Sequence, residues 1–153
     1  MDLCNCAALR KATRHVTKFY DAELAPVGLG VNQYSILMHL RRLGSCSISD
    51  LARHLVMDRS TLGHLLKPLE AKGWVALAED AVDRRSRRLA LSEGGWQLLR
   101  SARPLWEAAQ RRFEDQFGAE ESLALRRLMG RVAHCDFSTP SPESDVGSEG
   151  VRP

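Results

Sequence analysis

The sequence predicts a mainly α-helical fold with one small β-hairpin. Six segments repeat apolar residues every three or four positions, which is the period of an amphipathic helix. Residues 74–91 differ, because two short apolar runs flank a polar, arginine-rich stretch there, as in a hairpin. The chain has 153 residues, of which 44% are hydrophobic and 27% charged, so it suits one globular domain with or without a tail.

Two helices are expected before residue 44. The first runs from about Leu3 to Leu24, and Pro26 and Gly28 end it. Its apolar stripe consists of Leu9, Ala12, Val16, Phe19 and Tyr20. The second helix runs from Asn32, a favourable N-cap residue, to Leu43. It is expected to bury Ile36, Leu37 and Leu40.

A pair of short helices follows. Ser47 and Asp50 resemble a capping box at the start of the first helix, and Asp58 can cap the second. The second helix has an inward stripe of Leu62, Leu65, Leu66 and Leu69.

The hairpin comes next and two further helices complete the chain. Its strands are expected at residues 74–77 and 89–91, around a polar segment at 78–88. Ser92 caps a helix that extends to Phe117, and a last helix covers about Glu120 to His134. The long helix carries a heptad-like seam of Leu99, Ala102, Trp106, Ala109, Phe113 and Phe117. A monomer of this size cannot readily bury such a seam, so it predicts a partner surface.

Two short helices with a tight turn, followed by a basic hairpin, are the arrangement of a winged helix-turn-helix. The second helix of such a pair needs short polar and basic side chains on its outer face, and the hairpin tip needs cations for phosphate or the minor groove. Double-stranded DNA is therefore the expected partner. The expected contacts are Arg59, Ser60, Thr61, His64, Lys67, Arg84, Arg85, Arg87 and Arg88.

Charge divides the chain into a basic body and an acidic end. The segment from Asp136 onward has a net charge of −3, which leaves +6 on residues 1–135. That segment is rich in Ser, Pro and Gly, so residues 136–153 are expected to be a disordered acidic tail. Residues 31–92 are expected to form the DNA-binding domain, and residues 1–30 and 93–135 the dimerisation helices.

Several classes of protein are disfavoured. No apolar run approaches the roughly 18 residues of a membrane span, and the N-terminus lacks signal-peptide features, so a cytoplasmic location without membrane contact is expected. The sequence has no glycine-rich phosphate loop and no His-Glu-x-x-His motif, so neither an enzyme nor a cofactor is expected. Two alternatives stay open: a thiol-based peroxidase or other redox enzyme with Cys6 as nucleophile, and an adaptor that uses the winged fold for protein contacts.

Two stretches, DRSTLGHLLKPLEAKGWV and DRRSRRLALSEGG, resemble the signature of MarR-type transcriptional regulators. The matching wing residues are Asp83, Arg85, Leu89, Leu91, Ser92 and Gly95, and the resemblance covers about residues 5–135. It implies a two-fold homodimer, built from the first and last helices, that binds a pseudo-palindromic operator as a repressor released by a signal. It also implies that Asp83 braces the wing while Arg85 enters the minor groove.

The resemblance leaves two kinds of signal open, and oxidation is the first. Cys6, with Tyr20 14 residues further on, resembles the organic-hydroperoxide-sensing branch of the family, although Arg10 and Val31 stand where that branch has further tyrosines. A helix N-terminus and Arg10 would favour the thiolate of Cys6. Cys4 is a second candidate, and Cys135 could resolve a sulfenate across the dimer.

These cysteines have simpler interpretations too. Cys6 could be a small buried hydrophobe. Cys4 and Cys6 with His134 and Cys135 could hold a metal ion, but their spacing matches no standard zinc pattern, so no metal site is predicted. Cys46 is interpreted as a bystander in a loop.

A small aromatic ligand is the second kind of signal. The walls of its crevice are expected to come from His15, Phe19, Tyr34, Met38 and Trp106, all of which could equally be core residues. Arg14 or His15 could meet a carboxylate.

Overall fold

The computed structural model describes residues 4–79 and 87–138. The elements in chain order are α1 (Asn5–Leu24), the 3₁₀ helix η1 (Ala25–Val27), α2 (Val31–Leu43), β1 (Cys46–Ser47), α3 (Ile48–His54), α4 (Arg59–Ala71), β2 (Val75–Glu79), β3 (Arg87–Leu91), α5 (Glu93–Phe117) and α6 (Ala119–Ala133). The six helices and the hairpin strands that the sequence predicts are therefore confirmed. No helix within these ranges has the length and apolarity needed to cross a membrane.

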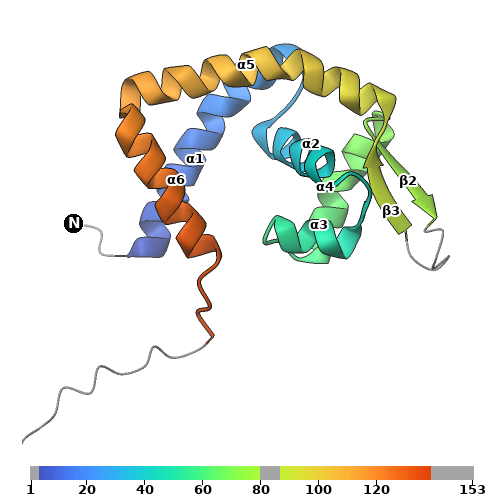
Figure 1. The fold of residues 1–153 in the computed structure, drawn as a ribbon, viewed down its shortest axis with the longest axis horizontal. Helices are drawn as coiled ribbons and strands as arrows, with labels where there is room; N and C mark the ends of the chain where they lie inside the picture. The colour runs from blue at the N-terminus through green and yellow to red at the C-terminus, as the bar shows by residue number, and fades with distance from the viewer. Residues whose placement is uncertain (1–3, 80–86, 139–153) are drawn as a thin grey trace, which may run out of the picture.

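Helix α5 links two parts of the molecule (Figure 1). Helix α6 continues from the C-terminal end of α5, and α1 runs from beside α6 to the middle of α5, whereas the N-terminal part of α5 carries α2, α3, α4 and the sheet. The main core lies in this second part, where the leucines of α2, α3 and α4 pack against β3 and the start of α5. The arrangement gives a helix-turn-helix lobe on one side and a helical arm on the other.

Hydroxyl and carboxylate caps start three of the helices, as the sequence predicts. The side chains of Ser47, Asp58 and Ser92 each accept a hydrogen bond from the backbone amide three residues further on. These caps satisfy amides that have no partner within the helix.

Helix α2 begins differently from the prediction. Gly30, not Asn32, is its N-cap residue, and the Gln33 side chain accepts a hydrogen bond from the Gly30 amide at 3.1 Å. Asp21 of α1 accepts from the Val31 amide at 2.7 Å. The start of α2 is therefore fixed by a tertiary contact with α1, which local sequence cannot reveal.

The sheet has three antiparallel strands in the order β1-β3-β2. Val75 pairs with Leu91 and Glu79 with Arg87, so β2 and β3 form the expected hairpin. Strand β1, in which Cys46 pairs with Leu89, was not expected from the sequence. Cys46 is consequently a buried strand residue and not a loop residue, and burial raises the pKa of its thiol.

Gly95 fixes the junction between the hairpin and α5. A Cβ atom at this position would lie 2.1 Å from the carbonyl oxygen of Trp74, so only glycine allows the first turn of α5 to pack on the start of β2. Ser92 reinforces the junction, because its hydroxyl donates to the carbonyl of Gly73.

The seam of α5 is covered along only part of its length. Leu99, Ala102 and Ala109 are buried, whereas Phe117 is 49% exposed. Helix α6 also leaves apolar side chains open, with Leu128 51% and Val132 40% exposed. The chain itself thus covers most of the predicted seam, and the apolar surface that stays open on the helical arm lies at Phe117 and on α6.

Candidate nucleic-acid interface

Helix α4 separates an apolar face from a polar one. Leu62, Leu66 and Leu69 are buried, and Leu65 packs against the core. The polar residues expected to contact DNA on this helix are all exposed; they are Arg59, Ser60, Thr61, His64 and Lys67. The helix therefore presents two kinds of hydrogen-bond donor, hydroxyl and cationic, to solvent along one face.

Asp58 holds the N-terminal end of this face in place. Its carboxylate accepts hydrogen bonds from the Thr61 amide at 2.7 Å and from the Thr61 hydroxyl at 2.6 Å. These bonds, with the hydroxyl bond the largest cause, lower the pKa of Asp58. Since the Thr61 hydroxyl proton is used in the cap, Thr61 keeps only its acceptor capacity for a base edge.

The turn between α3 and α4 has a residue that sequence reasoning missed. Val56 has a φ of 53° and is 73% exposed. Its amide donates to the Arg53 carbonyl at 3.2 Å, and the Met57 amide donates to the Ala52 carbonyl at 2.9 Å. These two bonds define a Schellman turn, which usually has glycine at this position. The sequence signal for this turn was a valine, at a position where glycine is usual, between two capped helices.

The wing strands place two arginines differently. Arg87 is exposed, whereas Arg88 is half-buried and its Nε donates to the Ser45 hydroxyl at 2.9 Å. A second Arg88 nitrogen donates to the Ser45 carbonyl. Arg88, which was also expected to contact DNA, ties β3 to the loop before β1. The predicted wing residues Asp83, Arg84 and Arg85 lie outside the described residues.

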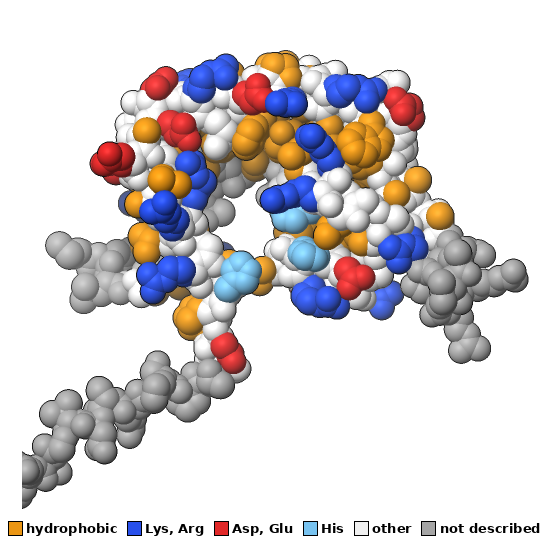
Figure 2. Space-filling model, viewed as in Figure 1, with side chains coloured by type: hydrophobic (Ala, Val, Ile, Leu, Met, Phe, Trp, Pro, Cys, Tyr) orange, Lys and Arg blue, Asp and Glu red, His pale blue; other side chains and the backbone are white. Residues whose placement is uncertain are grey.

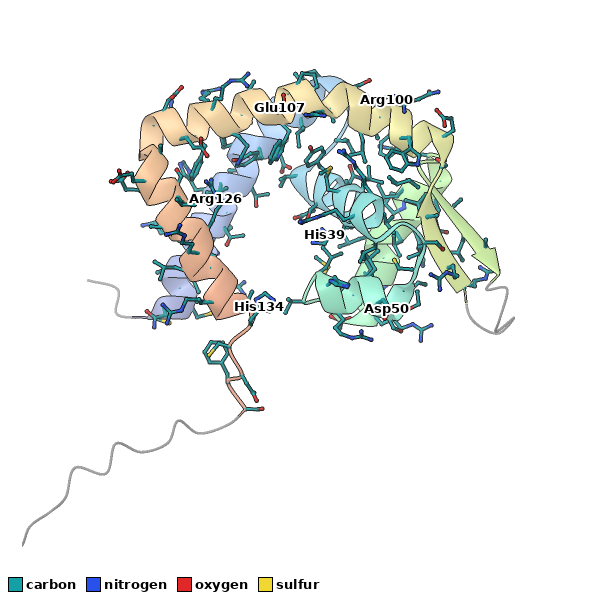
Figure 3. The ribbon with its side chains drawn as sticks, in the orientation of Figure 1. His39, Asp50, Arg100, Glu107, Arg126 and His134 are labelled. Atoms are coloured by element: carbon teal, nitrogen blue, oxygen red, sulfur yellow. The ribbon has the colours of Figure 1, made fainter. Side chains whose placement is uncertain are left out.

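Basic side chains lie on both parts of the molecule, the helix-turn-helix lobe included. Figure 2 shows Lys and Arg side chains along the lower edge of this lobe, on the side away from α5. Asp50, labelled on α3 in Figure 3, lies 3.2 Å from the guanidinium of Arg53, so its charge is partly offset. Hydrogen bonding to the Ser47 hydroxyl, together with Arg53, lowers the pKa of Asp50.

The cysteines of the redox hypothesis lie at the ends of the arm. Cys4, Cys6 and Cys135 are exposed, so Cys6 is not a buried hydrophobe. Helix α1 is continuous from Cys6 to Tyr20, which separates these residues by about 21 Å along the axis. Tyr20 can therefore meet a Cys6 sulfur only across a dimer.

Tyr20 already has a partner within its own chain. It is buried between α1 and α5, and its hydroxyl donates to Oε1 of Gln110. Burial and then the Glu114 carboxylate raise its pKa, while Arg126 opposes them.

For the metal alternative, the described part of the chain holds no group of three or more His, Cys, Asp or Glu side chains able to bind an ion.

The residues predicted for a ligand crevice fall into two separate places. His15 and Phe19 line a cavity of about 600 Å³ with Lys18, Phe113 and Phe117, between α1 and the end of α5. Tyr34 and Trp106 instead stack on each other in the core, with ring centroids 6.0 Å apart, and Met38 packs against that core. The five residues do not form one pocket in this chain.

The space-filling view also shows a hollow between the helical arm and the helix-turn-helix lobe (Figure 2). His39 lies on the α2 side of this hollow (Figure 3), and its Nδ1 is 2.8 Å from the Ser35 carbonyl oxygen.

The capped helix pair, its exposed polar face and the hairpin strands packed beside it define a winged helix-turn-helix protein. Residues 27–86 match the family model described as the MarR family. The repressor CouR, solved on a 23-mer DNA duplex, has a TM-score of 0.79 and 26% identity, over 86% of this chain and 93% of that one. The match to the model and this likeness make the chain similar to the winged-helix regulators of the MarR family.

Curated proteins of similar sequence are also regulators. The regulator PecS of Dickeya dadantii is 29% identical over 127 residues, which cover 81% of this chain and 76% of PecS. The regulator Hpr of Shouchella clausii is 36% identical over 94 residues, or 61% of this chain, and this chain spans about half (48%) of the length of that relative. All of these are regulators, so the thiol-enzyme alternative is not favoured, and nothing in them distinguishes a hydroperoxide sensor.

Proposed function

We propose that this protein is a homodimeric, sequence-specific DNA-binding regulator of transcription, a repressor that a signal releases from its operator. One observation carries the proposal: the polar and basic face of α4 is exposed while its leucine face is fixed in the core. That face has the donors that read base edges in the major groove. DNA-bound CouR supports this function in a protein of the same fold.

The dimer is proposed from the apolar surface of the arm. Phe117, Leu128 and Val132 are large exposed apolar residues on α5 and α6, and burying them against a second copy would remove them from water. Two-fold symmetry would place two α4 helices about one DNA turn apart, on the order of 34 Å. A protein acting on operator DNA in this way would work in the cytoplasm.

The signal is proposed to be either oxidation at Cys6 or a small aromatic acid. Exposure of Cys4, Cys6 and Cys135 supports the first. The cavity beside His15 and Phe19 supports the second, because it combines aromatic walls with the Lys18 ammonium.

The DNA-binding proposal is tested by selecting duplexes from a random library with the wild-type protein, then measuring affinity by fluorescence anisotropy across salt concentrations. We expect a pseudo-palindromic site whose affinity falls steeply with salt. The Arg59→Ala variant should bind several-fold more weakly. The Arg111→Ala variant, on the exposed face of α5, is the matched control and should bind normally. Equal affinity for the selected and a scrambled duplex would contradict the proposal.

The signal is tested on the same duplex. An organic hydroperoxide should release the wild type but not the Cys6→Ser variant if Cys6 is the sensor. Release of both proteins by salicylate, without an effect of hydroperoxide, would favour the aromatic acid instead.

A further inference from the structure

The turn between α3 and α4 contains a residue that its backbone does not favour. Val56 is the single non-glycine residue with a positive φ among residues 4–79 and 87–138. The left-handed region crowds the Cβ atom of any L-residue, and β-branched residues tolerate it least. Glycine would close the same Schellman turn without strain.

Packing does not account for Val56 either. The side chain is 73% exposed, more than any other large apolar residue described before α6 ends. Its isopropyl group therefore adds little to the core. A residue that is strained and also exposed in the free protein is a candidate for a role in binding.

The position of Val56 in the fold indicates which kind of partner its side chain could contact. It lies two residues before Asp58, the N-cap of α4, and three before Arg59 on the exposed face. In a helix-turn-helix, the N-terminal end of the second helix enters the major groove, so the turn that precedes it lies at the groove edge. The apolar group that bases present in this groove is the 5-methyl group of thymine.

We infer that Val56 is a specificity-determining residue that packs its isopropyl group against a thymine methyl in each operator half-site. The inference rests on the proposed function of the same surface. It adds an apolar contact to a face whose other residues are polar or cationic.

The experiment replaces each thymine of the selected duplex with uracil, which removes only the methyl group. Wild-type affinity should fall about fourfold at one thymine of each half-site, since a lost methyl contact corresponds to that factor. The Val56→Ala variant should bind the original duplex correspondingly more weakly, and the uracil duplex with no further loss.

The Val56→Gly variant separates strain from contact. It should show the same loss of affinity and of uracil response while melting about 2–4 °C higher, because the positive φ is then relaxed. Higher stability with weaker binding is not expected of a purely structural residue.

Three results would overturn the inference. Both variants could bind like the wild type, they could keep the full response to uracil, or Val56→Gly could melt at a lower temperature. Each of these leaves the proposed function intact. Loss of sequence preference in the wild type itself would instead defeat the proposed function and this inference together.

Discussion

At the residue scale, two carboxylates at the starts of α3 and α4 make the stability of the fold depend on pH. Asp50 and Asp58 each have a pKa below the ordinary range, mainly because of a hydroxyl that donates to them, from Ser47 and Thr61 respectively. A carboxyl with a lowered pKa stabilises the fold above its unfolded-state pKa of about 3.9, and this contribution is lost as the pH falls through the lower folded-state value.

We expect thermal stability to decline below about pH 4 for this reason. The Asp50→Asn, Asp58→Asn double variant keeps an acceptor for the Ser47 hydroxyl at position 50 and an N-cap side chain at position 58, neither of which titrates. Its melting temperature should therefore depend less on pH between 5 and 2.5. Circular dichroism melts over that range measure the effect. Identical pH profiles for the two proteins would show that other groups control acid unfolding.

Arg87 and Arg88 are adjacent residues with different surroundings. Arg87 is exposed on β3, whereas Arg88 is held by Ser45. Sequence alone treats them as equivalent cations, since neither spacing nor residue type separates them.

The Arg87→Ala variant should weaken binding to all duplexes, lower the salt slope by about one and leave the melting temperature unchanged. The Arg88→Ala variant should lower the melting temperature, because β3 loses its tie to the loop before β1. Salt titrations and melts of both proteins test this difference. A normal melting temperature for Arg88→Ala would contradict the assigned role.

At the element scale, the wing depends on how α5 begins. The hairpin ends at Leu91, Ser92 caps α5, and Gly95 lets the helix approach the Trp74 carbonyl. The orientation of β2 and β3 relative to α4 therefore depends on a contact that a single methyl group would block.

The Gly95→Ala variant should lose about 1–3 kcal/mol of unfolding free energy, since an overpacked junction must shift. Gly63→Ala is the matched control, because a Cβ atom there meets nothing within 4 Å inside helix α4. That variant should gain about 0.5–1 kcal/mol from helix propensity. Urea unfolding measures the unfolding free energy of both variants. Equal changes in the two variants would contradict the close packing of Gly95 against the Trp74 carbonyl.

At the scale of the whole molecule, the helical arm has apolar side chains that the chain itself does not cover. Its apolar residues are open at Phe117, Leu128 and Val132, while the helix-turn-helix lobe has a closed core. The proposed homodimer would therefore use the arm, where apolar side chains are open, and not the closed core of the lobe.

The Leu128→Asp, Val132→Asp double variant should be monomeric by sedimentation, because it would bury two charges in the proposed interface. Its operator affinity should fall by more than tenfold, since one α4 helix is then lost from each complex. Ala108→Asp, on the exposed polar face of α5, should remain dimeric. A dimeric double variant would place the interface elsewhere.

The six helices, the hairpin strands, three caps and the outward face of α4 could all be predicted from the amino-acid sequence. These features follow from apolar period and capping chemistry, which act within one or two helical turns. The tertiary structure alone decided the start of α2 at Gly30, strand β1 with buried Cys46, the tie from Arg88 to Ser45, and the separation of His15 and Phe19 from Tyr34 and Trp106. Each of these joins residues far apart in the chain or depends on which side a neighbour packs, and local pattern carries no such information.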